Sequence, residues 1–122
     1  WTVEYTNERK AFGKPIAGFQ NTRFKLAEIR AQLVTLRVYV DKCIELLMAG
    51  ELDAVDAAVA KLQSTEILCQ SLDDCLQMFG GYGYMWEYPI ARAWADNRYA
   101  RIAGGSTEIM KEIIGRSLTG QR

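Results

Sequence analysis

Two long stretches of the chain repeat apolar residues at alternating steps of three and four positions. The first covers residues 22–49 and the second residues 53–79. Such steps keep side chains on one face of an α-helix, so each stretch predicts a long helix with a continuous apolar stripe. The first stripe consists of Leu26, Ile29, Leu33, Leu36, Val40, Cys43 and Leu47, and the second of Val55, Ala58, Leu62, Thr65, Cys69, Leu72, Leu76 and Phe79.

A very short connection joins these two helices. Gly50 can cap the C-terminus of the first helix, and Asp53 can cap the N-terminus of the second. Helices joined by so short a turn pack antiparallel. Additional apolar positions widen the stripe of the first helix, so we expect that helix to have neighbours on more than one side; they are Phe24, Ala27, Ala31, Val34 and Val38.

Shorter elements flank the helical pair. Residues 1 to about 11 can form a helix that ends at the breakers Gly13 and Pro15, and a loop follows to about Gln20, where Asn21 or Thr22 can cap the first long helix.

On the other side of the pair, Pro89 suits the first turn of a short helix. Gly104 and Gly105 interrupt the chain, and Ser106 or Thr107 caps a last helix. The sequence therefore predicts one all-α domain over residues 1–122, an up-down bundle of four-helix type.

The glycine-rich stretch Gln77–Tyr84 lies at the end of the second long helix, before the short helix that begins near Pro89. Three glycines in four positions cannot continue a helix, and they leave backbone N–H groups open to close approach, by a phosphate among other ligands. A helix cap followed by a plain turn would use the same residues. The antiparallel pair brings this stretch next to residues 12–20, and thus places Arg9 and Gln20 near Gln77 and Gly80.

Composition excludes several classes of function. Lys and Arg together number 15, as do Asp and Glu, so no net charge favours nucleic acid. No apolar run approaches the roughly 18 residues of a membrane span, and no segment reads as a signal peptide. The chain has no His, which excludes Ser-His and Cys-His catalysis, and its three Cys lack the spacing of a zinc site. We expect Cys43, Cys69 and Cys75 to be reduced thiols.

The residues alone leave three candidate sites open. Four cations could receive a phosphate or pyrophosphate on the Gly13 loop or could be solvated near helix ends: Arg9, Lys10, Arg23 and Lys25. Glu108 and Glu112, one helical turn apart, could act as an acid–base pair or could form a solvated face, with Glu108 stabilised as an anion at a helix N-terminus. Aromatic side chains after the glycine-rich stretch could stack on a planar ring or could close the end of the bundle.

Three motifs resemble the C-terminal helical domain of acyl-CoA dehydrogenases. They are Arg9–Ile16 followed by Gln20, then Gln77–Tyr84, then Arg101–Ile109, in the same order and at similar spacing. The resemblance covers essentially all 122 residues. It implies that an N-terminal helical domain and a middle β domain belong to the intact enzyme and are absent from this chain, and the start at Trp1 without a Met reads as a cut inside a larger element.

The family's reaction removes an α proton from an acyl-CoA thioester and passes the β hydrogen as hydride to FAD. The resemblance implies that the intact parent is such an enzyme, with an acyl-CoA substrate, an electron-transfer acceptor and a dimeric or tetrameric assembly. It implies a location in the cytoplasm, or in the mitochondrial matrix of a eukaryote. We expect the isolated chain to be inactive and not to retain FAD.

Residue by residue, the resemblance assigns FAD contacts to two groups. Arg9 would contact the pyrophosphate, Phe12 would pack near the cofactor and Gln20 would lie near the adenosine. Gln77, Gly80 and Gly81 would hold the diphosphate region. Ser106 and Glu108, the latter at a position where Gln is common, would close over the flavin.

At Gly104, many family members carry the catalytic Glu. Glycine here is similar to the isovaleryl and long-chain type, in which the base comes from an earlier helix, so we expect the base upstream of Trp1 and none in this chain. Gly104 and Gly105 would then contact the substrate, and the N–H of Gly104 could polarise the thioester carbonyl. The alternatives are a helical assembly module of the same fold without flavin chemistry, and a family member with an altered reaction, such as an oxidase.

Overall fold

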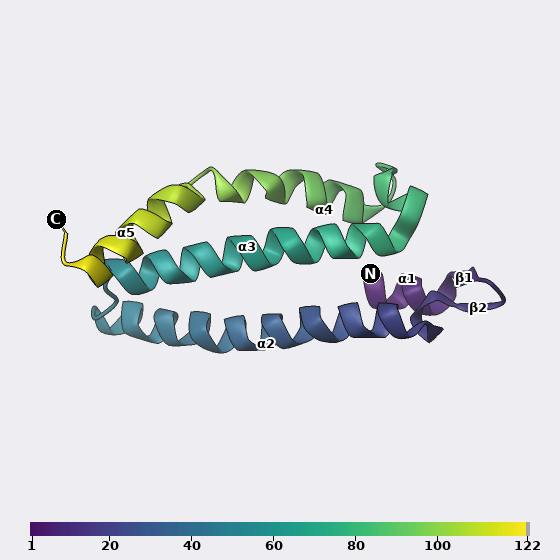
Figure 1. Cartoon of the computed structure of the whole chain (residues 1–122), viewed down its shortest axis with the longest axis horizontal. Coiled ribbons are helices and arrows are strands. Elements are labelled where there is room, and N and C mark those ends of the chain that lie inside the picture. The colour runs from purple at the N-terminus through teal and green to yellow at the C-terminus, as the bar shows by residue number, and fades with distance from the viewer. Residues whose placement is uncertain (122) are drawn as a thin grey trace.

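The computed structural model describes residues 1–121, and nearly all of its regular structure is helical (Figure 1). Its helices are α1 (Thr2–Glu8), α2 (Gln20–Ala49), α3 (Ala54–Phe79), α4 (Pro89–Arg98) and α5 (Thr107–Thr119), with short 3₁₀ turns at Ile16–Gly18, Gly80–Tyr84 and Tyr99–Arg101. Two strands of two residues, β1 (Lys10–Ala11) and β2 (Lys14–Pro15), form a small hairpin. The predicted all-α, up-down bundle is confirmed.

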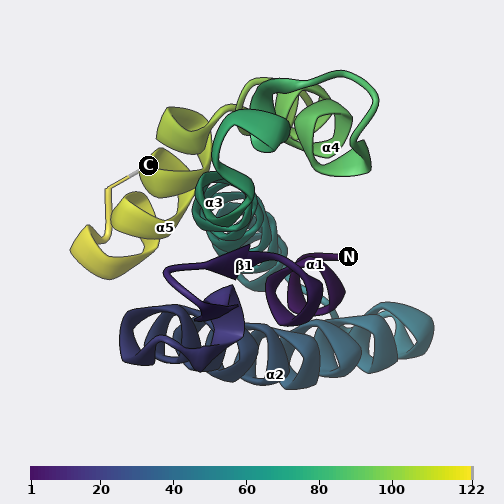
Figure 2. The same cartoon turned by 90° about the vertical axis from the view of Figure 1, so that its right-hand side faces the viewer.

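The central element is α3. Figure 2 shows α2 on one side of α3 and both α4 and α5 on the other. The chain runs along α2, returns along α3, and then runs back through α4 and α5 one after the other (Figure 1). The antiparallel pairing of α2 with α3 is therefore confirmed, and α4 and α5 share the third layer.

Local sequence signals set the ends of the long helices. Gly50 adopts the left-handed conformation, with φ 73°, and its N–H bonds the carbonyl of Leu47 at 3.1 Å, which ends α2. The carboxylate of Asp53 accepts the N–H of Asp56 at 2.7 Å and caps α3. Both predicted caps are confirmed.

The start of α2 differs from the prediction. The helix begins at Gln20 after Phe19, with no side-chain cap, and Thr22 is buried in its first turn. The preceding 3₁₀ turn, closed by the Phe19 N–H to the Ile16 carbonyl at 3.0 Å, leads the chain into the helix. Neither Asn21 nor Thr22 is therefore needed as a cap.

The first segment also differs, because α1 ends at Glu8 rather than near residue 11. Lys10 pairs with Pro15 and Ala11 with Lys14, so the two residues between them form the hairpin turn. Phe12 and Gly13 both have positive φ, 52° and 80°, which is the signature of a type I′ turn. This turn matches the twist of the strands, and the paired backbone replaces the last helical turn that the sequence predicted.

Much of the apolar surface of α2 remains exposed. Side chains that are at least two-fifths exposed there are Phe24, Leu33, Val34, Val38, Ile44, Leu47 and Met48. Among the described residues the main helical neighbour of α2 is α3, so the predicted second neighbour stays a prediction. None of the helices within residues 1–121 has both the length and the apolar character required to cross a bilayer.

A close backbone approach reverses the chain after α3. Gly80 takes φ 59°, and the following 3₁₀ turn carries Gly83 against the last turn of the helix. A Cβ at Gly83 would collide with the carbonyl oxygen of Leu76 and would lie 3.1 Å from the Phe79 Cβ. Only glycine fits there without a shift of backbone.

We therefore expect Gly83→Ala to lower the free energy of unfolding by about 1–3 kcal/mol, as overpacking typically does. Gly81→Ala is the matched control, because a Cβ at Gly81 meets open space and its φ is not positive. Its effect should stay within about 0.5 kcal/mol. Urea unfolding of both variants measures the difference, and equal stability of the two would refute the close approach.

Candidate functional site

An open groove of about 590 Å³ lies at the end of the bundle where the glycine-rich stretch meets the first segment. Arg9 and Ala11 line it from one side, and Gln77, Gly80 and Gly81 line it from the other. The chain geometry thus brings Arg9 to Gln77 and Gly80, as the antiparallel pairing predicted. Phe12 and Gln20 do not line this groove.

Stacked aromatic rings fix the position of α1 against the end of α3. The ring of Tyr5 stacks on that of Phe79, with centroids 4.0 Å apart and planes 12° apart. The Tyr5 hydroxyl donates to the Phe79 carbonyl at 3.2 Å, which satisfies a carbonyl at the helix terminus. Burial raises the pKa of Tyr5, so the hydroxyl stays protonated and remains a donor.

Arg9 follows directly after α1 in an extended conformation. Its guanidinium lies 5.5 Å from the ring centroid of Tyr82, within the range of a cation–π contact. Arg9 is exposed and forms no ion pair with a carboxylate among the described residues. The groove therefore carries a positive charge that is held in place and available to an anion.

Phe12 lies at the tip of the hairpin and is 97 % exposed. Its only ring contact in the described structure is with Phe19, edge to face at 6.4 Å. Gln20 is exposed at the first turn of α2. An aromatic side chain so fully exposed is available to contact something outside this chain. The predicted cofactor role of Phe12 stays a prediction.

The second group of predicted residues lies farther along the bundle, at the turn into α5. Gly104 and Gly105 have φ 65° and 97°, and the Ser106 hydroxyl accepts the N–H of Ile109 at 3.4 Å. Of the two predicted caps of α5, Ser106 or Thr107, Ser106 is the one observed. This turn packs near Glu66 of α3, about eleven residues before Gln77, so the two groups are separated by roughly 16 Å along the helix.

Glu108, in the first turn of α5, is exposed. Hydrogen bonds from its own backbone N–H and from the Ser106 hydroxyl hold the pKa of Glu108 below its ordinary value of 4.5. Glu112 is also exposed and pairs with Arg116 at 2.6 Å. These contacts favour the solvated face over the acid–base pair, because an exposed carboxylate stabilised as the anion is a weak proton acceptor.

The remaining candidate cations and thiols from the sequence occupy ordinary structural positions. Arg23 donates to the Gly18 carbonyl at 2.9 Å, and Lys25 lies 3.5 Å from the carboxylate of Asp74. Cys43 is buried and Cys69 and Cys75 are half-buried, all as free thiols. Among residues 1–121 no His, Cys, Asp or Glu side chains gather in a set that could hold a metal ion.

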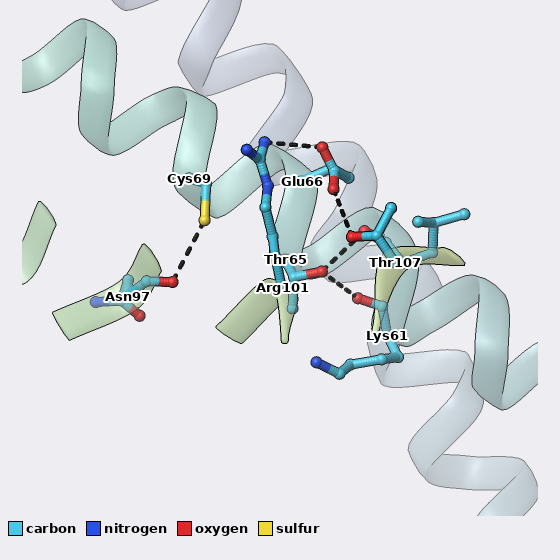
Figure 3. A network of polar contacts seen from close by, with 8 residues as sticks. Lys61, Thr65, Glu66, Cys69, Asn97, Arg101 and Thr107 are labelled. Atoms are coloured by element: carbon cyan, nitrogen blue, oxygen red, sulfur yellow. Dashed lines mark hydrogen bonds and ion pairs between the residues drawn. The ribbon is translucent and has the colours of Figure 1, made fainter. Parts of the chain in front are cut away.

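Two charged side chains of α3 that the sequence did not single out contact the turn before α5. They are Lys61, which donates to backbone carbonyls of this turn, and Glu66, which Figure 3 shows joined to Arg101 and to Thr107. The sequence signal was weak: both are polar positions beside an apolar stripe, and nothing local indicates partners some forty residues away.

Removing the Ser106 hydroxyl is expected to raise the pKa of Glu108 toward 4.5. A carboxyl whose pKa is lower in the folded protein stabilises the fold above its unfolded pKa, and this stabilisation is lost as the pH falls through the folded pKa. Ser106→Ala should therefore flatten the decline of stability below about pH 4.5. Carboxyl-carbon NMR titration measures the pKa directly. Ser117→Ala, on the same helix, should leave it unchanged, and an unchanged pKa in Ser106→Ala would contradict the contact.

Comparison with known proteins identifies the family. The family model described as "Acyl-CoA dehydrogenase, C-terminal domain" matches residues 1–119. The mitochondrial long-chain specific acyl-CoA dehydrogenase of Sus scrofa is 44 % identical over 117 residues, which are 96 % of this chain and 27 % of that protein. The chain thus spans about a quarter of the length of this relative.

Solved structures agree in fold and in sequence. An acyl-CoA dehydrogenase from Geobacillus kaustophilus superposes with a TM-score of 0.93 at 40 % identity, covering 96 % of this chain and 31 % of that one. Butyryl-CoA dehydrogenase from Megasphaera elsdenii gives 0.92 at 36 % identity, covering 97 % and 31 %. The chain therefore belongs to the acyl-CoA dehydrogenase family and corresponds to its C-terminal domain.

Proposed function

We propose that this chain is the C-terminal helical domain of an FAD-dependent acyl-CoA dehydrogenase that performs α,β-dehydrogenation of acyl-CoA thioesters. The observation that carries the proposal is the groove at the bundle end, where an available cation faces glycine backbone. In this proposal an N-terminal helical domain and a middle β domain belong to the same longer polypeptide.

The residues of the groove fit the diphosphate of FAD. The Arg9 guanidinium is exposed and without a carboxylate partner in the described structure, and Gln77 is exposed beside it. A Cβ at Gly80 or at Gly81 would meet nothing within 4 Å, so a ligand can come close to the backbone there. A cation and an amide are donors that suit a phosphate, and backbone without side chains allows its close approach.

Within this proposal, Arg9, Gln77, Gly80 and Gly81 hold the diphosphate, and Phe12 and Gln20 contact the rest of the cofactor. Ser106 and Glu108, at the turn into α5, close over the flavin. When bound, FAD supplies the hydride acceptor, and the protein supplies position and electrostatics. The groove is open on the outside, which supports the further proposal that residues 1–122 alone do not retain the cofactor.

Gly104 and Gly105 contact the substrate in this proposal, with the N–H of Gly104 directed at the thioester carbonyl. A position without a side chain allows the backbone to approach a ligand closely. The proton acceptor then comes from residues outside this chain, since Gly104 has no carboxylate and the lowered pKa of Glu108 makes it a poor base.

The partners proposed for the intact protein are an acyl-CoA, an electron-transfer acceptor and further copies of itself. The exposed apolar face of α2 supports a dimer or tetramer, because contiguous apolar surface on one helix commonly marks an interface. The location that we propose is the cytoplasm, or the mitochondrial matrix in a eukaryote, by analogy with the mitochondrial relative.

Arg9→Ala in the longer protein that contains this segment should weaken FAD binding roughly 10- to 100-fold, the effect of losing a hydrogen bond to a charged group. Arg30→Ala, an exposed arginine of α2, is the matched control and should leave binding unchanged. Flavin content and fluorescence titration measure both. The unsubstituted protein should bind FAD and lose flavin absorbance when an acyl-CoA is added without oxygen; a protein that binds no FAD would refute the proposal.

Glu108→Gln tests the origin of the proton acceptor. We expect some loss of FAD retention but less than a tenfold fall in the rate of flavin reduction, measured by stopped flow on flavin-loaded enzyme. Removal of a general base typically costs on the order of 100- to 10,000-fold. A fall of that size would show that Glu108 is the base and that the base lies in this chain.

A further inference from the structure

The chain between α4 and α5 forms a turn that neither helix continues. After the 3₁₀ turn Tyr99–Arg101, Ile102 and Ala103 both donate to the Tyr99 carbonyl, at 2.8 and 3.1 Å. Gly104 and Gly105 then adopt positive φ, which ends any helical pattern. The last carbonyls of such a segment have no N–H donors from a following turn, so their partners must come from elsewhere.

Lys61 of α3 provides those partners. Its Nζ donates to the carbonyl of Ala100 at 2.5 Å and to that of Ala103 at 2.9 Å. The side chain is half-buried, and its Cε lies 3.9 Å from the position that a Cβ on Gly104 would occupy. A cation placed at the C-terminal end of a helical segment also interacts favourably with its dipole. Lys61 thus holds the backbone directly before the glycine pair.

Glu66, slightly more than one helical turn along α3, holds the chain on both sides of the glycine pair. One carboxylate oxygen lies 2.8 Å from the Nη2 of Arg101, and the other accepts the hydroxyl of Thr107 at 2.9 Å. Arg101 precedes the glycines and Thr107 follows them, so a single carboxylate joins the two ends of the turn (Figure 3).

α3 carries a further anchor beyond Glu66. The Cys69 thiol donates to the carbonyl of Asn97, at the end of α4, at 3.4 Å. Contacts that join residues about 28 to 42 positions apart therefore follow one another along α3. They join residues 97–107 to α3 at several points.

From this geometry we infer that Lys61 and Glu66 are positioning residues for the Gly104–Gly105 backbone. Two glycines have wide conformational freedom, and without the contacts to α3 the turn would sample several paths. The purpose of the turn rests on the proposed function, in which this backbone faces the substrate thioester. The contacts that hold the turn do not depend on that function, and the two parts can be tested separately.

The first test measures the turn itself in the 122-residue chain. Lys61→Met keeps an apolar stem of similar length and removes the ammonium group. Amide hydrogen exchange at Ile102 and Ala103, whose N–H groups donate to the Tyr99 carbonyl, should then accelerate roughly 10- to 100-fold, the range expected when a hydrogen bond to a charged group is lost. Exchange at Ile90 and Ala91, buried in α4, should be unchanged and reports whether the fold is intact.

Matched variants separate positioning from a general loss of stability. Lys42→Met removes an exposed lysine that pairs with Glu45 in its own helix, and exchange at Ile102 and Ala103 should not change. Glu66→Ala should accelerate exchange there, and Glu66→Gln, which keeps an acceptor for the Thr107 hydroxyl, should restore part of the protection. If exchange at the turn is unaltered in both Lys61→Met and Glu66→Ala, the positioning role is overturned.

The second test uses the longer flavin-loaded protein. Lys61→Met and Glu66→Ala should slow flavin reduction by an acyl-CoA tenfold or more at saturating substrate, with FAD content unchanged. An unaltered rate together with faster exchange would overturn the link between the turn and the reaction. If the unsubstituted protein shows no reduction at all while exchange still rises in the variants, the proposed function fails and the positioning of the turn stands.

Discussion

The position of α4 and α5 depends on how closely the chain can approach α3 as it leaves that helix. Gly83 lies against the Leu76 carbonyl, and this contact lets the 3₁₀ turn fold back onto the helix it has just left. Ile90 and Ala91 of α4 then become buried against α3. The third layer of the bundle, and with it the turn at Gly104, therefore depends on a position at which a side chain would not fit.

The charged side chains of α2 and those of α3 make different kinds of contact. On α2, Arg37 and Asp41 form an exposed pair within one helix, and pairs of this kind contribute little to stability. Lys61 and Glu66 instead reach across to another segment from half-buried positions and satisfy backbone and side-chain groups there. Removing one member would leave its partners without a hydrogen bond, so these contacts specify the path of the chain more than they add to its stability.

The sequence predicted those features that depend on neighbours in the chain. The stripes of α2 and α3, the caps at Gly50 and Asp53 and the meeting of Arg9 with Gln77 all followed from periodicity and a short turn. The hairpin at Phe12 was missed because a non-glycine residue with positive φ gives no clear local signal.

Contacts across the fold were missed for another reason. The partners of Lys61 lie 39 and 42 residues away, and the pattern around Lys61 resembles any polar edge of an amphipathic helix. Tyr5, which fixes α1 by stacking on Phe79, is likewise 74 residues from its partner. Packing of one element on another decides such pairs, and no local propensity encodes it.

What this domain can contribute to chemistry follows from the environment of its polar groups. The carboxylate nearest the glycine pair in sequence, Glu108, is exposed and its pKa is lowered, whereas a useful base needs a pKa near the working pH. Arg9 is a cation that lines the groove and can bind an anion. In the function proposed above, the groups on both parts of the candidate site would therefore bind and orient the ligands. In the proposed enzyme, proton transfer would have to come from residues outside residues 1–122.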